Sequence, residues 1–219
     1  DQFTKDMEIF GQIKDGRERT GILAYRKEMW KTEEGMKRRL VLKLFSEGMH
    51  WRGTAELLMG RSLQLSIGAK GTPVPSYSVN ISRHDQIIQL ERSAQKWPLF
   101  PEKFSFFIDT TKGPRFYRLR RNVIGIGADY SLYDDRGRKI GKLDHRIINL
   151  GGSWIVKVDA AESYAKLEAV LQMFCALLKF NGAARRHVAK EVEQLQLGRA
   201  VRQLDTQERN LYLNPRRRR

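Results

Sequence analysis

Basic side chains between Lys112 and Arg146 are the residues of this sequence whose types and spacing best suit binding chemistry. Ten arginines and lysines stand against four aspartates in that stretch. Guanidinium groups bind phosphate oxygens in a bidentate manner, so the cluster predicts a site for phosphate-bearing ligands. Arg118 and Arg120 alternate in strand register and would point to one side together. The candidate anion-binding residues are Arg115, Arg118, Arg120, Arg121, Arg136, Arg138, Lys139, Lys142 and Arg146.

Two other interpretations of this cluster remain open. The same pattern is expected if it is only the solvated outer face of a barrel. Oligonucleotide-binding barrels would also use it, with bases stacked on neighbouring aromatic side chains such as Phe116 and Tyr133.

A second basic run ends the chain and favours nucleic acid. Tails of this kind are typically disordered and bind polyanions with strong salt dependence. Ribosomal or other RNA is the partner that the tail predicts. The residues expected to contact the polyanion are Arg216, Arg217, Arg218 and Arg219.

The overall composition points in the same direction. The 219 residues carry a formal net charge of +16, which predicts a polyanionic partner, either nucleic acid or an anionic membrane surface. The single cysteine, Cys175, allows no disulfide within the chain and favours an intracellular, reducing compartment. No window reaches the roughly 20 apolar residues that span a bilayer. We therefore expect no transmembrane span, and a protein of the cytoplasm or an organellar matrix, or one peripheral to a membrane.

Catalysis finds little support in the sequence. The four histidines are scattered and have no metal-ligand spacing. Burial among leucines would raise the pKa of the Cys175 thiol and make it inert. Gly125-Ile-Gly127 lacks the third glycine and the following helix of a dinucleotide-binding loop. We expect a protein that is not an enzyme and that uses no cofactor and no metal.

The elements that must position these residues are mostly strands. Short runs of alternating apolar and polar residues are separated by turns such as Asp134–Gly137 and Gly151-Gly152, a pattern typical of a meander in a barrel or sandwich. Strands are expected at 63–67, 77–81, 87–90, 104–108, 115–121, 130–133, 139–143, 147–150 and 154–158.

An unusually apolar helix follows the last of these strands. Between Tyr164 and Leu178 only Lys166, Glu168 and Gln172 are polar, and they do not form a broad polar face. A helix that is apolar all round is buried on all sides, so the natural container is a closed or nearly closed sheet. The alternative is an ordinary helix packed on one face of a sheet, with apolar residues left for a partner.

Two further helical regions are expected. Asn181-Gly182 should end the apolar helix, and a second, amphipathic stretch at 183–204 offers a face for a protein partner. Near the N-terminus, Thr32 can cap a helix that ends at Gly48. A helix, a glycine turn and a short helix capped by Thr54 would together make 40–67 resemble a helix-turn-helix, which would bind DNA.

The stretch YSLYDDRGRKIGKLDHRIINLGGSWIVKV, followed by AKLEAVLQMFCALLKF, resembles the second half of the tubby-like superfamily, which includes the LURP-one-related proteins and the phospholipid scramblases. The resemblance covers roughly 104–180, with a fainter echo at 77–90. It implies a β-barrel threaded by a hydrophobic helix, and phosphoinositide headgroups bound by basic residues of the two strands flanking Tyr130. The cysteine-rich stretch of many animal scramblases and a calcium-loop spacing are absent.

We therefore expect a mainly β (α+β) fold: an antiparallel β-barrel around a central hydrophobic helix, with helical N- and C-terminal extensions. The expected division is a partly helical extension at 1–60, a tubby-like barrel at 61–181 with its central helix at 162–180, and an amphipathic helix and basic tail at 182–219. The leading functional hypothesis is a binding module for anionic lipid headgroups. An RNA- or DNA-binding ribonucleoprotein component and a scaffold subunit are the competing classes.

Overall fold

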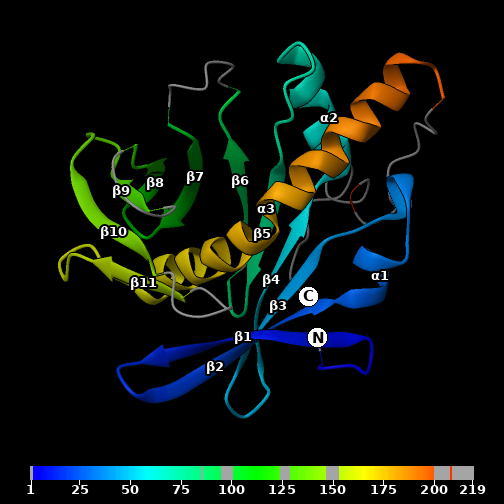
Figure 1. Ribbon diagram of the computed structural model, residues 1–219. Coiled ribbons are helices and arrows are strands. Elements are labelled where there is room, and N and C mark those ends of the chain that lie inside the picture. The colour runs from blue at the N-terminus through cyan, green and yellow to red at the C-terminus, as the bar shows by residue number, and fades with distance from the viewer. Residues whose placement is uncertain are drawn as a thin grey trace.

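Each strand of this protein pairs with the strand that precedes or follows it in sequence. The structure, a computed structural model, describes residues 2–84, 86–94, 101–123, 129–146, 153–199 and 208. Within those residues eleven antiparallel strands form one sheet in the order β1 to β11, followed by the long helix α3 (Figure 1). The fold is therefore mainly β, as predicted, and in the described part of the chain β11 is not paired with β1.

The strands are β1 (Met7–Asp15), β2 (Glu18–Arg26), β3 (Val41–Ser46), β4 (Trp51–Leu57), β5 (Ser76–Ile81), β6 (Ile87–Arg92), β7 (Lys103–Thr110), β8 (Gly113–Arg121), β9 (Tyr130–Tyr133), β10 (Lys139–Arg146) and β11 (Ser153–Val158). The helices are α1 (Lys27–Lys31), the 3-10 turn η1 (Gly35–Lys37), α2 (Met59–Gly68) and α3 (Ala165–Gln196). The strands predicted from 77–81 onward are confirmed, apart from the one at 147–150, which lies outside the described residues.

The turn between β9 and β10 forms as its sequence predicts. Asp134 Oδ1 accepts hydrogen bonds from the backbone N–H groups of Arg136 (3.0 Å) and Arg138 (2.8 Å). Gly137 has a φ of +76°, a left-handed conformation that glycine adopts without strain. The turn therefore fixes the register of the two strands that it joins.

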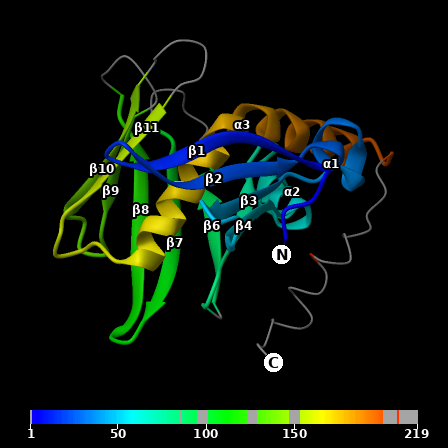
Figure 2. The same cartoon turned by 90° about the horizontal axis from the view of Figure 1, so that it is seen from below.

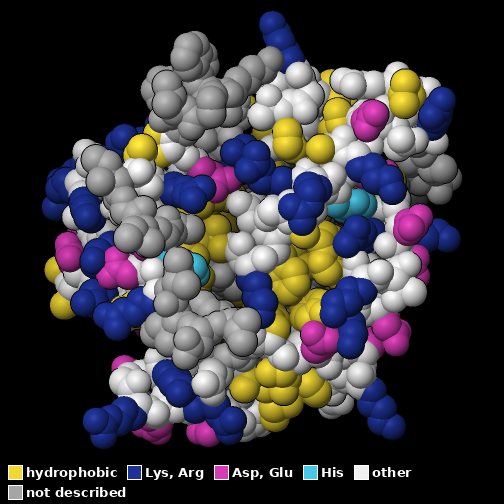
Figure 3. Space-filling view, viewed as in Figure 1, with side chains coloured by type: hydrophobic (Ala, Val, Ile, Leu, Met, Phe, Trp, Pro, Cys, Tyr) yellow, Lys and Arg dark blue, Asp and Glu magenta, His cyan; other side chains and the backbone are white. Residues whose placement is uncertain are grey.

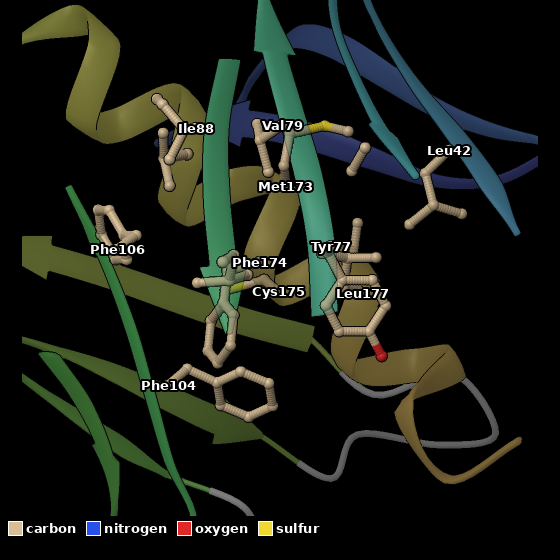
Figure 4. Close-up of a cluster of buried hydrophobic side chains, with 14 of the residues drawn as sticks. Leu42, Tyr77, Val79, Ile88, Phe104, Phe106, Met173, Phe174, Cys175 and Leu177 are labelled. Atoms are coloured by element: carbon tan, nitrogen blue, oxygen red, sulfur yellow. The ribbon is translucent and has the colours of Figure 1, made fainter. Parts of the chain in front are cut away.

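Helix α3 fills the inside of the curved sheet. Between Leu167 and Leu177 only the side chain of Glu168 is exposed. The ring of Phe174 lies 5.1 Å from that of Phe104 and 5.2 Å from that of Tyr130. Figure 4 shows side chains of α3 meeting those of β5, β6 and β7 in this core. The predicted burial of this helix segment is confirmed.

Helix α3 also reaches both edge strands of the sheet. The ring of Phe180 lies 5.2 Å from that of Phe10 in β1, and the helix packs against β11 as well. Figure 2 shows α3 between the β1–β2 pair and the strands β7 to β11. The sheet thus curves around the helix instead of lying flat beneath it.

The predicted end of this helix at Asn181-Gly182 is wrong, because α3 continues to Gln196. Asn181 does not cap the helix: its side chain bonds to Glu102 (3.3 Å) and Tyr77 (3.4 Å) instead. Beyond Gly182 the helix continues to pack against the rest of the fold. A stripe of its side chains, spaced four residues apart, is buried. The buried residues are Ala184, Val188 and Val192. These residues of the predicted partner face pack on this chain, whereas Leu197 is exposed, and the binding of a protein partner through 183–204 stays a prediction.

By length and composition, α3 is able to cross a membrane, although 56% of its most apolar stretch is buried inside the fold. A core helix has the same length and composition. The expected absence of a transmembrane span stays a prediction.

The helix predicted between Thr32 and Gly48 is wrong, because residues Val41–Ser46 form strand β3. Leu42 and Leu44 face the main core, whereas Phe45 faces a second, smaller cluster on the other side of the sheet. Burial on both faces removes the alternation of apolar and polar residues that marks a half-buried strand. An apolar run of this kind is easily mistaken for a helical pattern.

The predicted strand at 63–67 is also wrong, because these residues belong to helix α2. The hydroxyls of Ser62 and Ser66 donate to the carbonyls of Leu58 and Ser62, each at 2.6 Å, one turn back along the helix. Thr54, expected to cap a helix, lies in β4. Residues 40–67 therefore form two strands and one helix, and the helix-turn-helix interpretation is wrong.

Strands β1 to β4 belong to the same sheet as β5 to β11. The sheet itself therefore gives no boundary at residue 60, where we expected one. The helices of the supposed N-terminal extension, within the residues described before 59, are the five-residue α1 and the three-residue η1.

Glu208 connects the C-terminal part of the chain to α2. Its carboxylate accepts hydrogen bonds from the backbone N–H groups of Gly60 (3.0 Å) and Arg61 (2.9 Å). These are among the first N–H groups of a helix, which have no partner within it, and Leu58 at the N-cap position supplies no side-chain hydrogen bond. Glu208 therefore caps α2 from a distant part of the sequence.

Candidate anion-binding surfaces

Arg118 and Arg120 point to the same side of β8, as predicted, and that side is the outer face of the sheet. Tyr117 and Leu119, which alternate with them in β8, are fully buried against the core, whereas both arginines are exposed. The period-two geometry of a strand forces this division. Side chains of Lys and Arg gather on the left of Figure 3, over β7 to β11, with some acidic residues among them.

Strand register extends the arrangement into two transverse rows. Arg120 lies opposite Lys103 of β7 on one side and Ser131 of β9 on the other, and the row continues through Lys142 of β10 to Lys157 of β11. Neighbouring strands lie about 4.8 Å apart, so consecutive members of a row are close together, although Ser131 is buried and a bulge after Lys139 separates the two rows on β10. The second row contains Ser105, Arg118, Tyr133 and Lys139 on four successive strands. We call the following residues the basic face: Lys103, Arg118, Arg120, Lys139, Lys142 and Lys157.

Two outward-facing aromatic residues flank the basic face. Phe107 of β7 lies opposite Phe116 of β8, with ring centroids 4.8 Å apart. The side chain of Phe107 is 57% exposed, and the guanidinium of Arg118 lies 5.4 Å from the Phe116 ring. In Figure 2 the β7–β8 hairpin projects beyond the neighbouring strands. The projecting hairpin thus combines an apolar pair with adjacent positive charge.

Two of the predicted anion ligands are instead bound by acidic residues of this chain. Arg115 shares the inner face of β8 with Tyr117 and forms an ion pair with Glu162 at 2.6 Å. Arg138 pairs with Asp134 (2.7 Å) and with Glu162 (3.3 Å). The hydrogen bond from Arg115 to Glu162 raises the pKa of the arginine, which fits a structural role. Both arginines thus contact Glu162, in the segment before α3.

The remaining predicted strand and turn ligands lie around the basic face. Lys142 belongs to it but also pairs with Asp144 at 2.7 Å. Arg121 ends β8, Arg146 ends β10, and Arg136 lies in the β9–β10 turn. All three are exposed and form no ion pair within the described residues.

The predicted tail contacts fall on a part of the chain that the structure does not describe. The four residues concerned are Arg216, Arg217, Arg218 and Arg219. Their binding to a polyanion stays a prediction from the sequence.

Lys103 and Lys157 were missed by reasoning from the sequence. Each is an isolated lysine in its own segment, so no local cluster marks it. Only the pairing of β7 with β8 and of β10 with β11 brings these lysines into line with Arg120 and Lys142.

A second group of polar residues, also missed from the sequence, lies where β6 ends and β7 begins. Glu102 Oε1 accepts from Nε of Arg92 and from Asn181 (3.3 Å), and Oε2 accepts from the Tyr130 hydroxyl (2.7 Å). The Tyr77 hydroxyl donates to Asn181 at 3.4 Å. We call the following residues the inner cluster: Tyr77, Arg92, Glu102, Tyr130, Asn181 and the nearby Arg185.

Burial shapes the electrostatics of the inner cluster. The side chains of Arg92 and Glu102 are 9% and 10% exposed. Burial acts to raise the pKa of Glu102, but the hydrogen bond from Arg92 and that from Tyr130 outweigh it, and the net pKa is lowered. Burial and the neighbouring Glu102 charge raise the pKa of the Tyr130 hydroxyl. Glu102 is therefore a charged, fully partnered carboxylate beside neutral tyrosines.

His187 and Cys175 are both buried in the fold. His187 is buried beside Glu191, with its Nδ1 3.9 Å from Oε1 of that residue and its ring 5.9 Å from that of Trp30. Burial lowers the pKa of His187 to about 4, so its ring is neutral at pH 7. Burial raises the pKa of the Cys175 thiol. Within the described ranges no cluster of His, Cys, Asp and Glu is arranged to hold a metal ion.

Comparison with known proteins gives no relative: no family model, no curated protein and no solved structure matches this chain.

Proposed function

We propose that this protein binds phosphate-bearing anionic membrane surfaces through the basic face, with the Phe107–Phe116 pair entering the interfacial region. The observation that carries the proposal is the transverse row from Lys103 through Arg120 and Lys142 to Lys157. Four basic residues on five adjacent strands make an extended positive surface instead of a single ion pair. A surface of this shape suits a plane of headgroups.

The aromatic pair favours a lipid surface over a polynucleotide. An exposed Phe107 at the projecting hairpin has no polar group, so it gains most from an apolar environment. Basic residues next to an exposed apolar group are typical of proteins that lie at a membrane interface. For RNA, the stacking groups would be Phe116 and Tyr133, and Phe107 would contribute less.

The resemblance to the tubby-like superfamily supports the same proposal. Its implied architecture, a barrel around a hydrophobic helix, is compatible with a curved sheet of sequential antiparallel strands that packs around α3. We propose that the protein has this barrel architecture, and that the lipid site uses the basic residues of β8 and β10, on either side of β9.

Vesicle co-sedimentation tests the proposal. The full chain is mixed with neutral phosphatidylcholine vesicles, and with vesicles that also contain phosphatidylserine or a phosphoinositide. Each basic residue near such a surface contributes about 1 kcal/mol, so R118A/R120A should weaken binding to the anionic vesicles roughly 30-fold. The matched control K14A/R17A removes two exposed charges from the β1–β2 hairpin and should bind nearly as the wild type does.

Equal losses in the two double variants would mean that only net charge matters and would refute a specific basic face. Equal binding to neutral and anionic vesicles would refute the electrostatic mechanism. A parallel RNA mobility-shift titration in rising salt covers the competing class. The nucleic-acid function is favoured if RNA binds and vesicles do not.

A further inference from the structure

The inner cluster contains one more positive charge than its carboxylate can neutralise. Asn181 and Arg185 lie four residues apart on α3, so their side chains share a face of the helix. Asn181 contacts Glu102 and Tyr77, which places Arg185 at the same end of the sheet. The cluster therefore holds two guanidinium groups, Arg92 and Arg185, and a single carboxylate.

Both oxygens of the Glu102 carboxylate already have partners. Oε1 accepts from Arg92 and Asn181, and Oε2 accepts from Tyr130. Arg185 forms no ion pair within the described residues, and its Nε is buried without a hydrogen-bond partner. An arginine Nε–H that is removed from water and left unpaired is costly, and natural proteins seldom retain such a group without a function.

The undescribed segments that follow these strands in sequence contain no acid, whereas Asp85 and Asp205 belong to other undescribed parts of the chain. The segments that follow β6, β8 and β10 are 95–100, 124–128 and 147–152, and none contains Asp or Glu. Burial, and next the charge of Arg92, lower the pKa of Arg185, which means that its charged form is destabilised in this environment. A singly charged anion would compensate the surplus.

We propose that Arg185 and Arg92 bind one singly charged oxyanion of the phosphodiester type, with the side chain of Arg185 turning so that its buried Nε becomes a direct donor. Arginine presents its N–H groups in a planar fork that matches two oxygens of such a group. Arg92 is held in place by Glu102 and by the carbonyls of Pro73 (3.3 Å) and Ser93 (3.4 Å), so its guanidinium is preorganised. Arg185 is partly exposed, which leaves it accessible to a ligand from solution.

The phosphodiester could belong to a phospholipid or to a small soluble molecule, and carboxylates carry the same charge. Three probes separate these sources: dimethyl phosphate, acetate, and dihexanoyl phosphatidylglycerol below its micelle concentration. Sodium chloride at equal ionic strength controls for screening. The inference is independent of the basic face, since its residues lie on the inner side of the sheet and are absent from the R118A/R120A test.

The decisive readout is the arginine Nε–Hε region of a ¹H–¹⁵N NMR spectrum of the full chain. The Arg185 peak is assigned by its loss in R185Q, or in R185K if R185Q does not fold. We expect dimethyl phosphate to move this peak in wild type and in R186Q, the exposed neighbour on α3. A larger response to the lipid probe at equal concentration would identify a phospholipid as the source, and a larger response to acetate would refute the phosphodiester class.

Thermal unfolding provides a second, independent test of the proposal. If Arg185 is an unpaired binding group, R185Q should unfold at a higher temperature than wild type in the absence of ligand, because it removes a poorly solvated charge next to Arg92. A peak that does not move, or one that moves equally with chloride, overturns the proposal. So does an R185Q variant that is less stable than R186Q, since Arg185 would then be stabilising the fold itself.

Discussion

The hydroxyl of Tyr130 donates a 2.7 Å hydrogen bond to Oε2 of Glu102, which joins the start of β9 to the residue before β7. In the sheet β8 lies between these two strands. The bond therefore links β9 to the start of β7 across β8, on the inner side of the sheet. Because the acceptor is a buried carboxylate, the bond belongs to the stronger, charge-assisted class.

Tyr130→Phe should therefore destabilise the protein while leaving the ring in place. The Glu102 carboxylate would lose one of its partners, and hydrogen bonds to charged groups contribute about 1.5–3 kcal/mol. The free energy of unfolding in urea measures the change. Tyr133→Phe, on the outer face of the same strand, is the matched control and should have little effect. Equal losses for the two variants would contradict the importance of the Glu102 bond.

The buried His187 should make stability depend on pH below neutrality. Its pKa is about 4 in the folded protein and near 6.5 when unfolded, so the unfolded chain binds the proton more tightly. Stability is then unaffected by His187 above pH 6.5 and falls as the pH drops from 6.5 towards 4. Burial raises the pKa of the neighbouring Glu191, which acts in the opposite sense as the pH falls.

A comparison of wild type with His187→Gln isolates this contribution. The difference in unfolding free energy between the two proteins should change steadily between pH 6.5 and about 4. Outside that window it should be constant. A pH-independent difference would show that His187 titrates normally and is not desolvated in solution.

Phe107→Ser should weaken vesicle binding without destabilising the fold, because the ring is largely exposed. Burying a phenylalanine side chain is worth about 1.5–3 kcal/mol, so at least a tenfold loss of affinity is expected if the ring enters the interface. Ile67→Ser, at a similarly exposed position on α2, controls for general surface hydrophobicity. Unchanged co-sedimentation of the Phe107 variant would remove the apolar anchor from the proposed mechanism.

Glu208→Ala should destabilise α2 selectively. Loss of the bonds to Gly60 and Arg61 leaves two N-terminal N–H groups of the helix unpaired, and loss of a cap typically costs about 1 kcal/mol. Amide hydrogen exchange should accelerate at Ser62 and the residues after it, but not in β5. The exposed Glu193→Ala on α3 is the control, and similar exchange in both variants would argue against the cap.

Cys175 should not react with a thiol reagent such as DTNB while the protein is folded. Burial within α3 raises the pKa of its thiol and shields it from solvent. One equivalent should react on unfolding in denaturant. Rapid reaction of the native protein would show that α3 leaves its site in the sheet on the timescale of the assay.

The sequence predicted secondary structure best for strands that have one face exposed to solvent. In β8 the alternation of buried Tyr117 and Leu119 with exposed Arg118 and Arg120 is visible in the sequence itself, and the Asp134–Gly137 turn marks the next hairpin. In β3 both faces are buried, so the pattern indicated the wrong element. The periodicity of a single segment shows only which of its side chains face solvent.

The two candidate sites were predictable to different degrees. Arg118 and Arg120 could be placed together because they are close in the chain. Residues such as Lys103 depend on register across several hairpins, which a single strand does not encode. Arg92 and Arg185 come together only because α3 passes straight through residues 181–182, where glycine usually ends a helix. Tertiary contacts overrode that local preference.

The position of α3 after all the described strands has a consequence for synthesis. Sequential hairpins can form as the nascent chain emerges, because each strand pairs with its neighbour. Their inner apolar surface, however, lacks the helix that it packs against until Ala165–Gln196 has been made. The half-built protein is thus expected to need chaperone protection, and premature termination before residue 165 should give an aggregating product and not a smaller folded one.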